Sequence, residues 1–271
     1  LHLLSRRQRQ MCIRDRVKDY RVFLIDLDGT VYRGKETVES GVRFVHRLVQ
    51  AGKDYLFLTN NTTRTPQMVV DKLKGHGIET DTDHVYTPSM ATASYILQRE
   101  HKEKIGLYII GQIGLWRELL QHPEFELNEE NPDYVIVGMD TDLTYHKVRV
   151  ASRAIRRGAT FIGTNADMNL PAEDELIPGN GSQCAFVAAA SGVEPLYIGK
   201  PESIIVKMAL DKVGYSKDEA LLVGDNYDTD IKAGFNSGVD QLLTLTGVTT
   251  KVDIADKRQP TILVNNLDEF E

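Results

Sequence analysis

The chain of 271 residues has little cysteine, no long apolar run and no excess of positive charge. Only Cys12 and Cys184 are present, which is typical of a reducing compartment, so we expect a cytoplasmic protein. No apolar stretch approaches roughly 18 residues, so we expect no transmembrane helix and no membrane partner. The formal net charge of −7 argues against a nucleic-acid partner, because binding a phosphate backbone needs clustered cations.

The composition otherwise fits a folded protein. Hydrophobic residues make up 41% of the chain, which is too many for a disordered segment. Residues 1–16 differ, because they hold five arginines and no periodic pattern. They resemble the in-frame translation of a sequencing-library adapter; a basic tail or a targeting segment is the alternative, without the apolar stretch of a secretory signal. We predict that residues 1–16 are a non-native extension, disordered or extending from the folded core.

The most informative pattern is a pair of aspartates directly after an apolar run. Val22 to Ile25 is predicted to be a buried strand, and Asp26-Leu27-Asp28-Gly29-Thr30 follows it. In an open α/β sheet, chemistry gathers beyond the carboxyl ends of the strands. Gly29 permits a sharp turn there, because it has no Cβ to clash at unusual φ. Two carboxylates at such a turn could bind a hard cation and take different chemical roles.

Three further apolar runs end in polar groups. Residues 54–58 lead into Thr59-Asn60-Asn61, whose hydroxyl and amides suit a phosphate oxygen, and residues 195–199 lead into Lys200, a point charge suited to phosphate. Residues 220–224 lead into Asp225, with Asp228 and Asp230 close behind. Each motif alone has a structural alternative, namely a Thr cap, a solvated lysine or an acidic helix start. Their joint occurrence in this order favours a functional site.

The order of the predicted elements divides the chain into three parts. Residues 17–86 and 195–271 each alternate between strands and helices, as in βα units. Between them, residues 87–194 contain three more apolar runs, at 105–110, 134–137 and 159–162, with helical patterns around them. This middle stretch is too long and too patterned to be a loop, and it is large enough to be a domain.

Together, the four motifs resemble those of the haloacid dehalogenase (HAD) superfamily in its Mg-dependent phosphatase form. The sequence Gly224-Asp225-Asn226-Tyr227-Asp228-Thr229-Asp230-Ile231 and the long insert before Lys200 are similar to the NagD-like branch with a type II cap, which includes 4-nitrophenyl phosphatases, nucleotide phosphatases and sugar phosphatases. The resemblance covers residues 20–271. It implies an α/β fold, with a Rossmann-like parallel-sheet core (17–86 and 195–271), an inserted α/β cap (87–194) and a homodimer formed through the cap.

The resemblance also implies a role for each motif residue. Asp26 is the nucleophile that forms an aspartyl-phosphate, and Asp28 protonates the leaving oxygen and later activates water. Thr59 and Lys200 bind the phosphoryl group, and Asn60 assists. The implied cofactor is Mg²⁺, held by Asp26, Asp225 and the backbone carbonyl of Asp28. Asp230 orients Lys200 or a metal-bound water, whereas Asp228 has the weakest claim to a direct role.

The cap is expected to select the substrate. Residues 163–171 are rich in turn formers, and Asn165 and Asp167 in this segment are candidate specificity residues. Gly179 and Gly181 could cradle an anion, but a plain turn before a capped helix fits the same residues. The implied partner is a small phosphorylated metabolite, such as a sugar phosphate, a sugar-acid phosphate or a nucleoside monophosphate. A phosphotransferase or mutase and a non-catalytic phosphate-binding protein are the alternatives.

Overall fold

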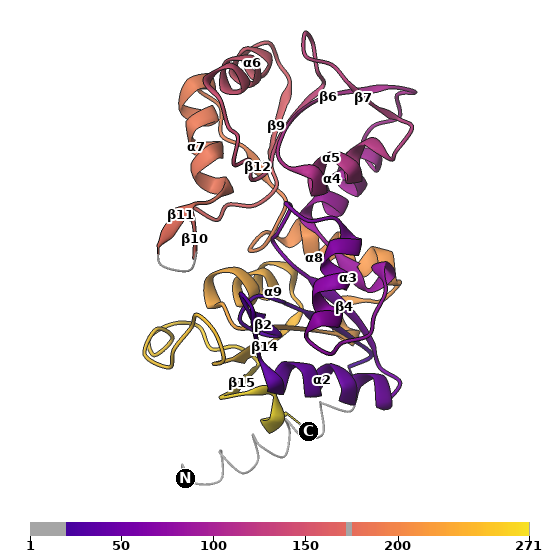
Figure 1. The fold of residues 1–271 in the computed structure, drawn as a ribbon, viewed down its shortest axis with the longest axis vertical. Helices are drawn as coiled ribbons and strands as arrows, with labels where there is room; N and C mark the ends of the chain where they lie inside the picture. Colours follow the sequence, from indigo (N-terminus) through magenta and orange to yellow (C-terminus); the bar gives the residue numbers. More distant parts are fainter. Residues whose placement is uncertain (1–19, 172–174, 271) are drawn as a thin grey trace. The chain divides into compact units, whose positions relative to one another are not determined.

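The computed structural model describes residues 20–171 and 175–270. The predicted adapter-like extension, residues 1–16, lies outside them. The described chain forms two compact units: unit 1 contains residues 20–59, 70–85 and 209–270, and unit 2 contains residues 60–69, 86–171 and 175–208. In Figure 1, unit 1 therefore takes its colours from both ends of the sequence, whereas unit 2 is built from the middle of the chain.

Unit 1 is built on a six-stranded sheet with the order β15-β14-β13-β1-β4-β5. Parallel ladders join β1 to β13 and β4, and join β14 to β13 and β15. The central strand β1 is buried along its whole length because it has neighbours on both sides. The strands are β1 (Val22–Ile25), β4 (Asp54–Leu58), β5 (Val85–Tyr86), β13 (Ala220–Gly224), β14 (Asp240–Thr244) and β15 (Ile262–Val264).

The helices of unit 1 include α2 (Glu39–Gln50), whose apolar residues Val42, Val45 and Leu48 recur at helical spacing and are buried. Helices α3 (Pro66–Gly75) and α8 (Ser203–Val213) each begin in unit 2 and end in unit 1. The remaining elements are α9 (Lys232–Ser237), the hairpin strands β2 (Tyr32–Arg33) and β3 (Glu36–Thr37), the 3₁₀ helices η1 (Thr82–His84), η2 (Lys217–Glu219) and η4 (Leu267–Glu269), and the π-helix η3 (Tyr227–Ile231).

Unit 2 has its own five-stranded sheet, with the order β12-β9-β8-β6-β7 and parallel pairing throughout. Helices α6 and α7 pack on an apolar cluster that includes Val135, Phe161 and Cys184. The elements are β6 (Ile105–Ile110), β7 (Phe125–Leu127), β8 (Tyr134–Val137), β9 (Thr160–Gly163), β12 (Leu196–Tyr197), the antiparallel pair β10 (Asn169–Pro171) and β11 (Leu176–Pro178), and the helices α4 (Pro88–Leu97), α5 (Ile113–Leu120), α6 (Tyr145–Arg156) and α7 (Asn180–Ser191).

The predicted fold class, α/β with parallel sheets, is confirmed. The hairpins β2–β3 and β10–β11 and strand β7 were not predicted, because elements of two or three residues carry no readable periodicity. Strand β12 pairs with β9 in the unit 2 sheet, and unit 2 extends to residue 208. The cap at residues 87–194 stays a prediction. Within the described residues, the structure has no helix that combines the length and apolarity needed to cross a membrane.

Candidate active site

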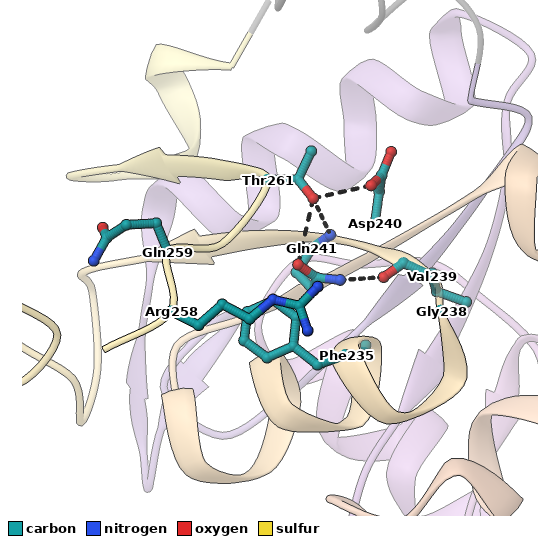
Figure 2. A pocket seen from close by; sticks show the side chains of 9 residues that line it. Phe235, Gly238, Val239, Asp240, Gln241, Arg258, Gln259 and Thr261 are labelled. Atoms are coloured by element: carbon teal, nitrogen blue, oxygen red, sulfur yellow. Dashed lines mark hydrogen bonds between the residues drawn. The ribbon is translucent and has the colours of Figure 1, made fainter. Parts of the chain in front are cut away.

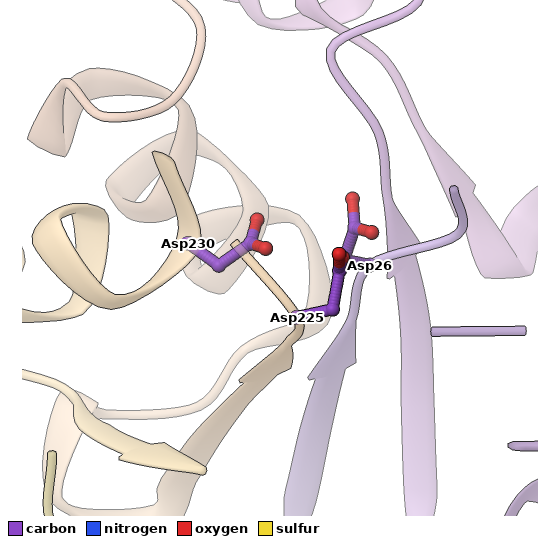
Figure 3. Close-up of side chains that lie close together, drawn as sticks. All are labelled: Asp26, Asp225 and Asp230. Carbon is purple, nitrogen blue, oxygen red and sulfur yellow. The ribbon is translucent and has the colours of Figure 1, made fainter. Parts of the chain in front are cut away.

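Three aspartates meet at the carboxyl edge of the unit 1 sheet (Figure 3). Asp26 follows β1 and Asp225 follows β13, and the register of these neighbouring strands pairs Ile25 with Val223. The Asp26 N–H donates to the Val223 carbonyl at 2.8 Å, which extends the ladder by one residue. Asp230 reaches the same place from η3, and one carboxylate oxygen of each aspartate lies within 4.8 Å of the others.

These three carboxylates are buried, with exposed fractions of 7% for Asp26 and 1% each for Asp225 and Asp230. Like charges this close, away from water, repel one another strongly unless a cation or a proton intervenes. Carboxylate oxygens are the ligands that hard divalent cations prefer. The donor set therefore fits a site for a metal such as Mg²⁺.

Hydrogen bonds orient the acids from several segments. The Val248 N–H donates to Asp225 Oδ2 at 2.7 Å, and the Asn226 N–H donates to Asp230 Oδ2 at 3.0 Å. The Thr30 hydroxyl lies 3.5 Å from both Asp26 Oδ2 and Asp225 Oδ1. Each carboxylate is thus held by groups outside its own strand, which keeps the three side chains turned toward one another.

Two glycines let the backbone approach Asp225 closely. Gly29 has φ of +97°, and a Cβ at this position would lie 2.3 Å from Asp225 Oδ2. A Cβ on Gly247 would lie 1.9 Å from the same atom. Gly29 was expected to make a turn, but Gly247 was not singled out from the sequence, because its proximity to Asp225 arises only in the folded chain.

Asp28 differs from the buried acids, because its side chain is 57% exposed. Its Oδ1 lies 3.9 Å from the Nζ of Lys72, which in turn sits 3.4 Å from the ring centroid of Tyr32. The His76 ring stacks on the Tyr32 ring, and burial together with the charge of Lys72 lowers the pKa of His76. Lys72 was not predicted, since a lysine on a helix is usually a solvated residue.

Thr59 follows β4, which pairs with β1 on the side opposite β13. Its side chain is buried at 3% exposure. The ends of β13, β1 and β4 therefore carry Asp225, Asp26 and Thr59 along one edge of the sheet.

The other predicted site residues gather in unit 2. The Lys200 N–H donates to Asn60 Oδ1, and Asn60 Nδ2 donates to the Lys200 carbonyl, both at 2.9 Å. Asn60 Nδ2 also donates to Asp167 Oδ2 at 3.0 Å, and Asn165 Nδ2 donates to the Asn60 carbonyl at 2.8 Å. The structure thus brings together Asn60, Lys200 and the pair Asn165 and Asp167, from three separate segments of the chain.

The glycine pair before α7 has a structural role. The Gly179 N–H donates to the Met168 carbonyl at 2.8 Å, and the Gly181 N–H donates to the Asp167 carbonyl at 2.9 Å. These amides hold the loop that carries Asn165 and Asp167 against the start of the helix. Of the two interpretations left open by the sequence, the turn before a helix matches these bonds.

A separate recess of about 180 Å³ lies in unit 1 (Figure 2). It includes Asp240 and Gln241 at the start of β14, whereas Asp26 and Asp225 follow the ends of β1 and β13 and Asp230 lies on η3. Thr261 donates to Asp240 Oδ1 at 2.9 Å and to Gln241 Oε1 at 3.3 Å, and Gln241 donates to the Val239 carbonyl. The side chains of Asp240, Gln241 and Thr261 thus form one hydrogen-bonded group, at the end of the strands opposite to the three aspartates.

Known proteins are similar to this chain over nearly its whole length. Family models described as haloacid dehalogenase-like hydrolase and as HAD-hydrolase-like match residues 23–123 and 197–270. The 5'-nucleotidase YutF of Bacillus subtilis is 45% identical over 255 residues, covering 94% of this chain and 98% of the relative. An acid sugar phosphatase of Staphylococcus aureus is 41% identical over 244 residues, covering 90% and 93%.

Solved structures agree with these relatives. A double mutant of the thermostable NPPase of Geobacillus stearothermophilus matches with a TM-score of 0.87 and 43% identity, covering 93% of this chain and 98% of that one. NagD of Escherichia coli K-12 matches with a TM-score of 0.86 and 30% identity, at the same coverage. The four motifs, the fold and these similarities together show that the chain belongs to the haloacid dehalogenase-like hydrolases, within their NagD-like phosphatase branch.

Proposed function

We propose that the protein hydrolyses small phosphomonoesters with the help of Mg²⁺, through an aspartyl-phosphate on Asp26. The observation that carries this proposal is the group of three buried carboxylates at the ends of β1 and β13 and on η3. Buried acids so close together need a cation nearby, and a phosphate monoester, with about two negative charges at pH 7, needs one as well. Asp26 and Asp225 would hold the ion, together with the backbone carbonyl of Asp28.

The ion, when bound, supplies positive charge that lets a carboxylate approach an anionic phosphate. Asp26 attacks phosphorus and displaces the alcohol of the substrate, while Asp28 protonates the leaving oxygen. Water then attacks the acyl-phosphate after giving a proton to Asp28, which restores both aspartates and releases phosphate. The exposed position of Asp28 suits a group that meets both the leaving alcohol and water.

The remaining site residues offset the charge of the phosphoryl group or hold the acids in place. We assign the first role to the Thr59 hydroxyl and the Lys200 ammonium. Asp230 accepts the Asn226 N–H and is assigned an orienting role beside the metal ligands. Asn165 and Asp167, on the unit 2 loop between β9 and β10, are assigned to substrate selection.

The names of the relatives suggest the substrate class. A 5'-nucleotidase and an acid sugar phosphatase are each above 40% identical to this chain. We therefore propose sugar phosphates, sugar-acid phosphates or nucleoside monophosphates as substrates of a cytoplasmic enzyme. The net charge of −7 supports a small phosphorylated metabolite over a nucleic acid, and we propose neither a nucleic-acid partner nor a membrane partner. We also propose a homodimer formed through the cap, as in the resembling family.

Phosphate release from a panel of sugar phosphates, nucleotides and 4-nitrophenyl phosphate tests this function, with Mg²⁺ and with EDTA. We expect metal-dependent release that falls on the order of 10⁴-fold or more in Asp26→Asn, because the nucleophile is lost. Asp218→Asn is the matched control, since it makes the same change at an exposed residue of η2, which precedes β13. Release that survives in Asp26→Asn would contradict the nucleophile assignment.

A further inference from the structure

Asn60 holds the backbone of Lys200 by both of its hydrogen-bonding groups. Asn60 Oδ1 accepts the Lys200 N–H, and Asn60 Nδ2 donates to the Lys200 carbonyl, each at 2.9 Å. A carboxamide that bonds the donor and the acceptor of one residue restrains the rotation of that residue about its own backbone. The direction in which the Lys200 side chain leaves the backbone is therefore set by Asn60.

Close packing around Gly199 reinforces this pairing. A Cβ on Gly199 would lie 2.8 Å from Asn60 Oδ1 and 2.6 Å from the Thr164 carbonyl oxygen, so the segment before Lys200 approaches both more closely than a side chain permits. Lys200 itself is 1% exposed. A buried side chain on a restrained backbone has few alternative positions for its ammonium group.

The donors of Asn60 are fully used by the protein. Its second Nδ2 hydrogen bond goes to Asp167 Oδ2 at 3.0 Å, and an asparagine has only two N–H donors. Asn165 and Asn180 continue the network, since Asn165 donates to the Asn60 carbonyl and Asn180, 1% exposed, donates to the Asn165 carbonyl, both at 2.8 Å. The Asn60 side chain thus bonds Lys200 and the loop between β9 and β10.

We propose that Asn60 is a positioning residue for the phosphatase reaction, which acts by fixing the backbone of Lys200. This inference rests on the proposed function, in which the Lys200 ammonium group binds the phosphoryl group and offsets its negative charge. Loss of the pairing leaves the charge of Lys200 in place but removes the restraint on where its ammonium group lies. A displacement of about 1 Å at a positioned group can cost about 10²-fold in rate.

Two variants separate the halves of the pairing. Asn60→Asp keeps the size and an acceptor for the Lys200 N–H, but loses both N–H donations and places a carboxylate against a carbonyl and Asp167. Asn60→Ala removes all three bonds. Asn128→Asp is the matched control, because Asn128 Oδ1 only accepts backbone N–H bonds in a unit 2 turn, from Glu130 and Asn131, and a carboxylate can do the same.

The readouts are kcat and KM for 4-nitrophenyl phosphate, the inhibition constant of inorganic phosphate, and the melting temperature. We expect the inhibition constant to rise about 10-fold or more in both Asn60 variants and kcat to fall by up to about 10²-fold, with Asn128→Asp like the wild type. A merely structural role would lower the melting temperature and leave phosphate inhibition of the folded enzyme unchanged. Asn60→Ser, whose short side chain cannot bond both groups, replaces a variant that does not fold.

An inhibition constant within about twofold of the wild type in the folded Asn60 variants would overturn the inference. If Asn60 fixes the Lys200 ammonium group, its loss must weaken the binding of any phosphate that this group contacts. Failure of the proposed function looks different. In that case the wild type itself releases no phosphate from the sugar phosphates, the nucleotides or 4-nitrophenyl phosphate.

Discussion

Unit 1 and unit 2 share an architecture but differ at the carboxyl ends of their strands. In unit 1, β1 and β13 end in the buried acids Asp26 and Asp225. In unit 2, β9 is followed by Thr164 and Asn165, and β12 leads to Lys200. A parallel sheet thus offers the same edge in both units, and the side chains placed there decide whether it suits a cation or an anion.

The units also differ in how their titratable groups are perturbed. In the described part of unit 2, burial is the main cause that raises the pKa of three phenols and one thiol, namely Tyr108, Tyr134, Cys184 and Tyr197. In unit 1, hydrogen bonds lower the pKa of surface carboxyls, among them Asp81, Asp228, Asp253, Asp268, Glu219 and Glu269.

The largest expected effect tests the acidic edge of unit 1. Gly247→Ala places a Cβ where only 1.9 Å separates it from Asp225 Oδ2, so the loop or the carboxylate must move. We expect kcat/KM to fall about 10²-fold or more, with a raised Mg²⁺ requirement. Gly75→Ala is the control, because a Cβ there meets nothing within 4 Å. Equal activity of the two variants would show that the close approach does not position Asp225.

A smaller effect tests the buried thiol of unit 2. Burial raises the pKa of Cys184 to about 12, above its value in the unfolded chain, so the folded state keeps the proton more tightly. The stability that depends on this proton is present below about pH 9 and is lost as pH rises toward 12. Between pH 8 and 10.5 we expect the wild type to lose roughly 2 kcal/mol more unfolding free energy than Cys184→Ala, from about 1.4 kcal/mol per pH unit.

Urea unfolding at the two pH values measures this difference. Cys12→Ser is the matched control, because it removes the other thiol of the chain. Parallel pH dependence in the wild type and Cys184→Ala would show that the thiol ionises in the folded protein as easily as in the unfolded one.

The smallest effect tests a surface carboxyl of unit 1. Hydrogen bonding to Lys232 is the main cause that lowers the pKa of Asp228, whose side chain is 59% exposed. The stabilisation is present above the unfolded pKa of about 4 and is lost as pH falls through the folded value. We expect Asp228→Asn to lower the unfolding free energy by about 0.3–0.5 kcal/mol at pH 7 and by nothing at pH 2.5. A difference that persists at pH 2.5, or that 1 M salt does not reduce, would point to packing.

Sequence patterns predicted the parts of the site that are local. Asp26, Thr59 and Asp225 each follow an apolar run directly, and a parallel sheet brings such positions to one edge. The contacts of Gly247 with Asp225 and of Lys72 with Asp28 were not predictable, because each joins residues far apart in the chain through a loop or helix of ordinary composition. The hydrogen bonds of the Asn60 side chain were not predictable either. The sequence indicates an amide near the phosphate, but not which backbone and side-chain groups that amide bonds.

The pairing of β1 with β13 has a consequence for the order of folding. Its register joins Val22 to Ala220, so the central strand of unit 1 must wait for a partner made very late in synthesis. Every strand of the unit 2 sheet, from Ile105 to Tyr197, is made before β13. Since domains tend to fold as units during synthesis, the unit 2 sheet can close on the ribosome while β1 and β4 still expose an unpaired apolar edge. The acids of the candidate active site can therefore come together only after the last strand of the unit 2 sheet has been made.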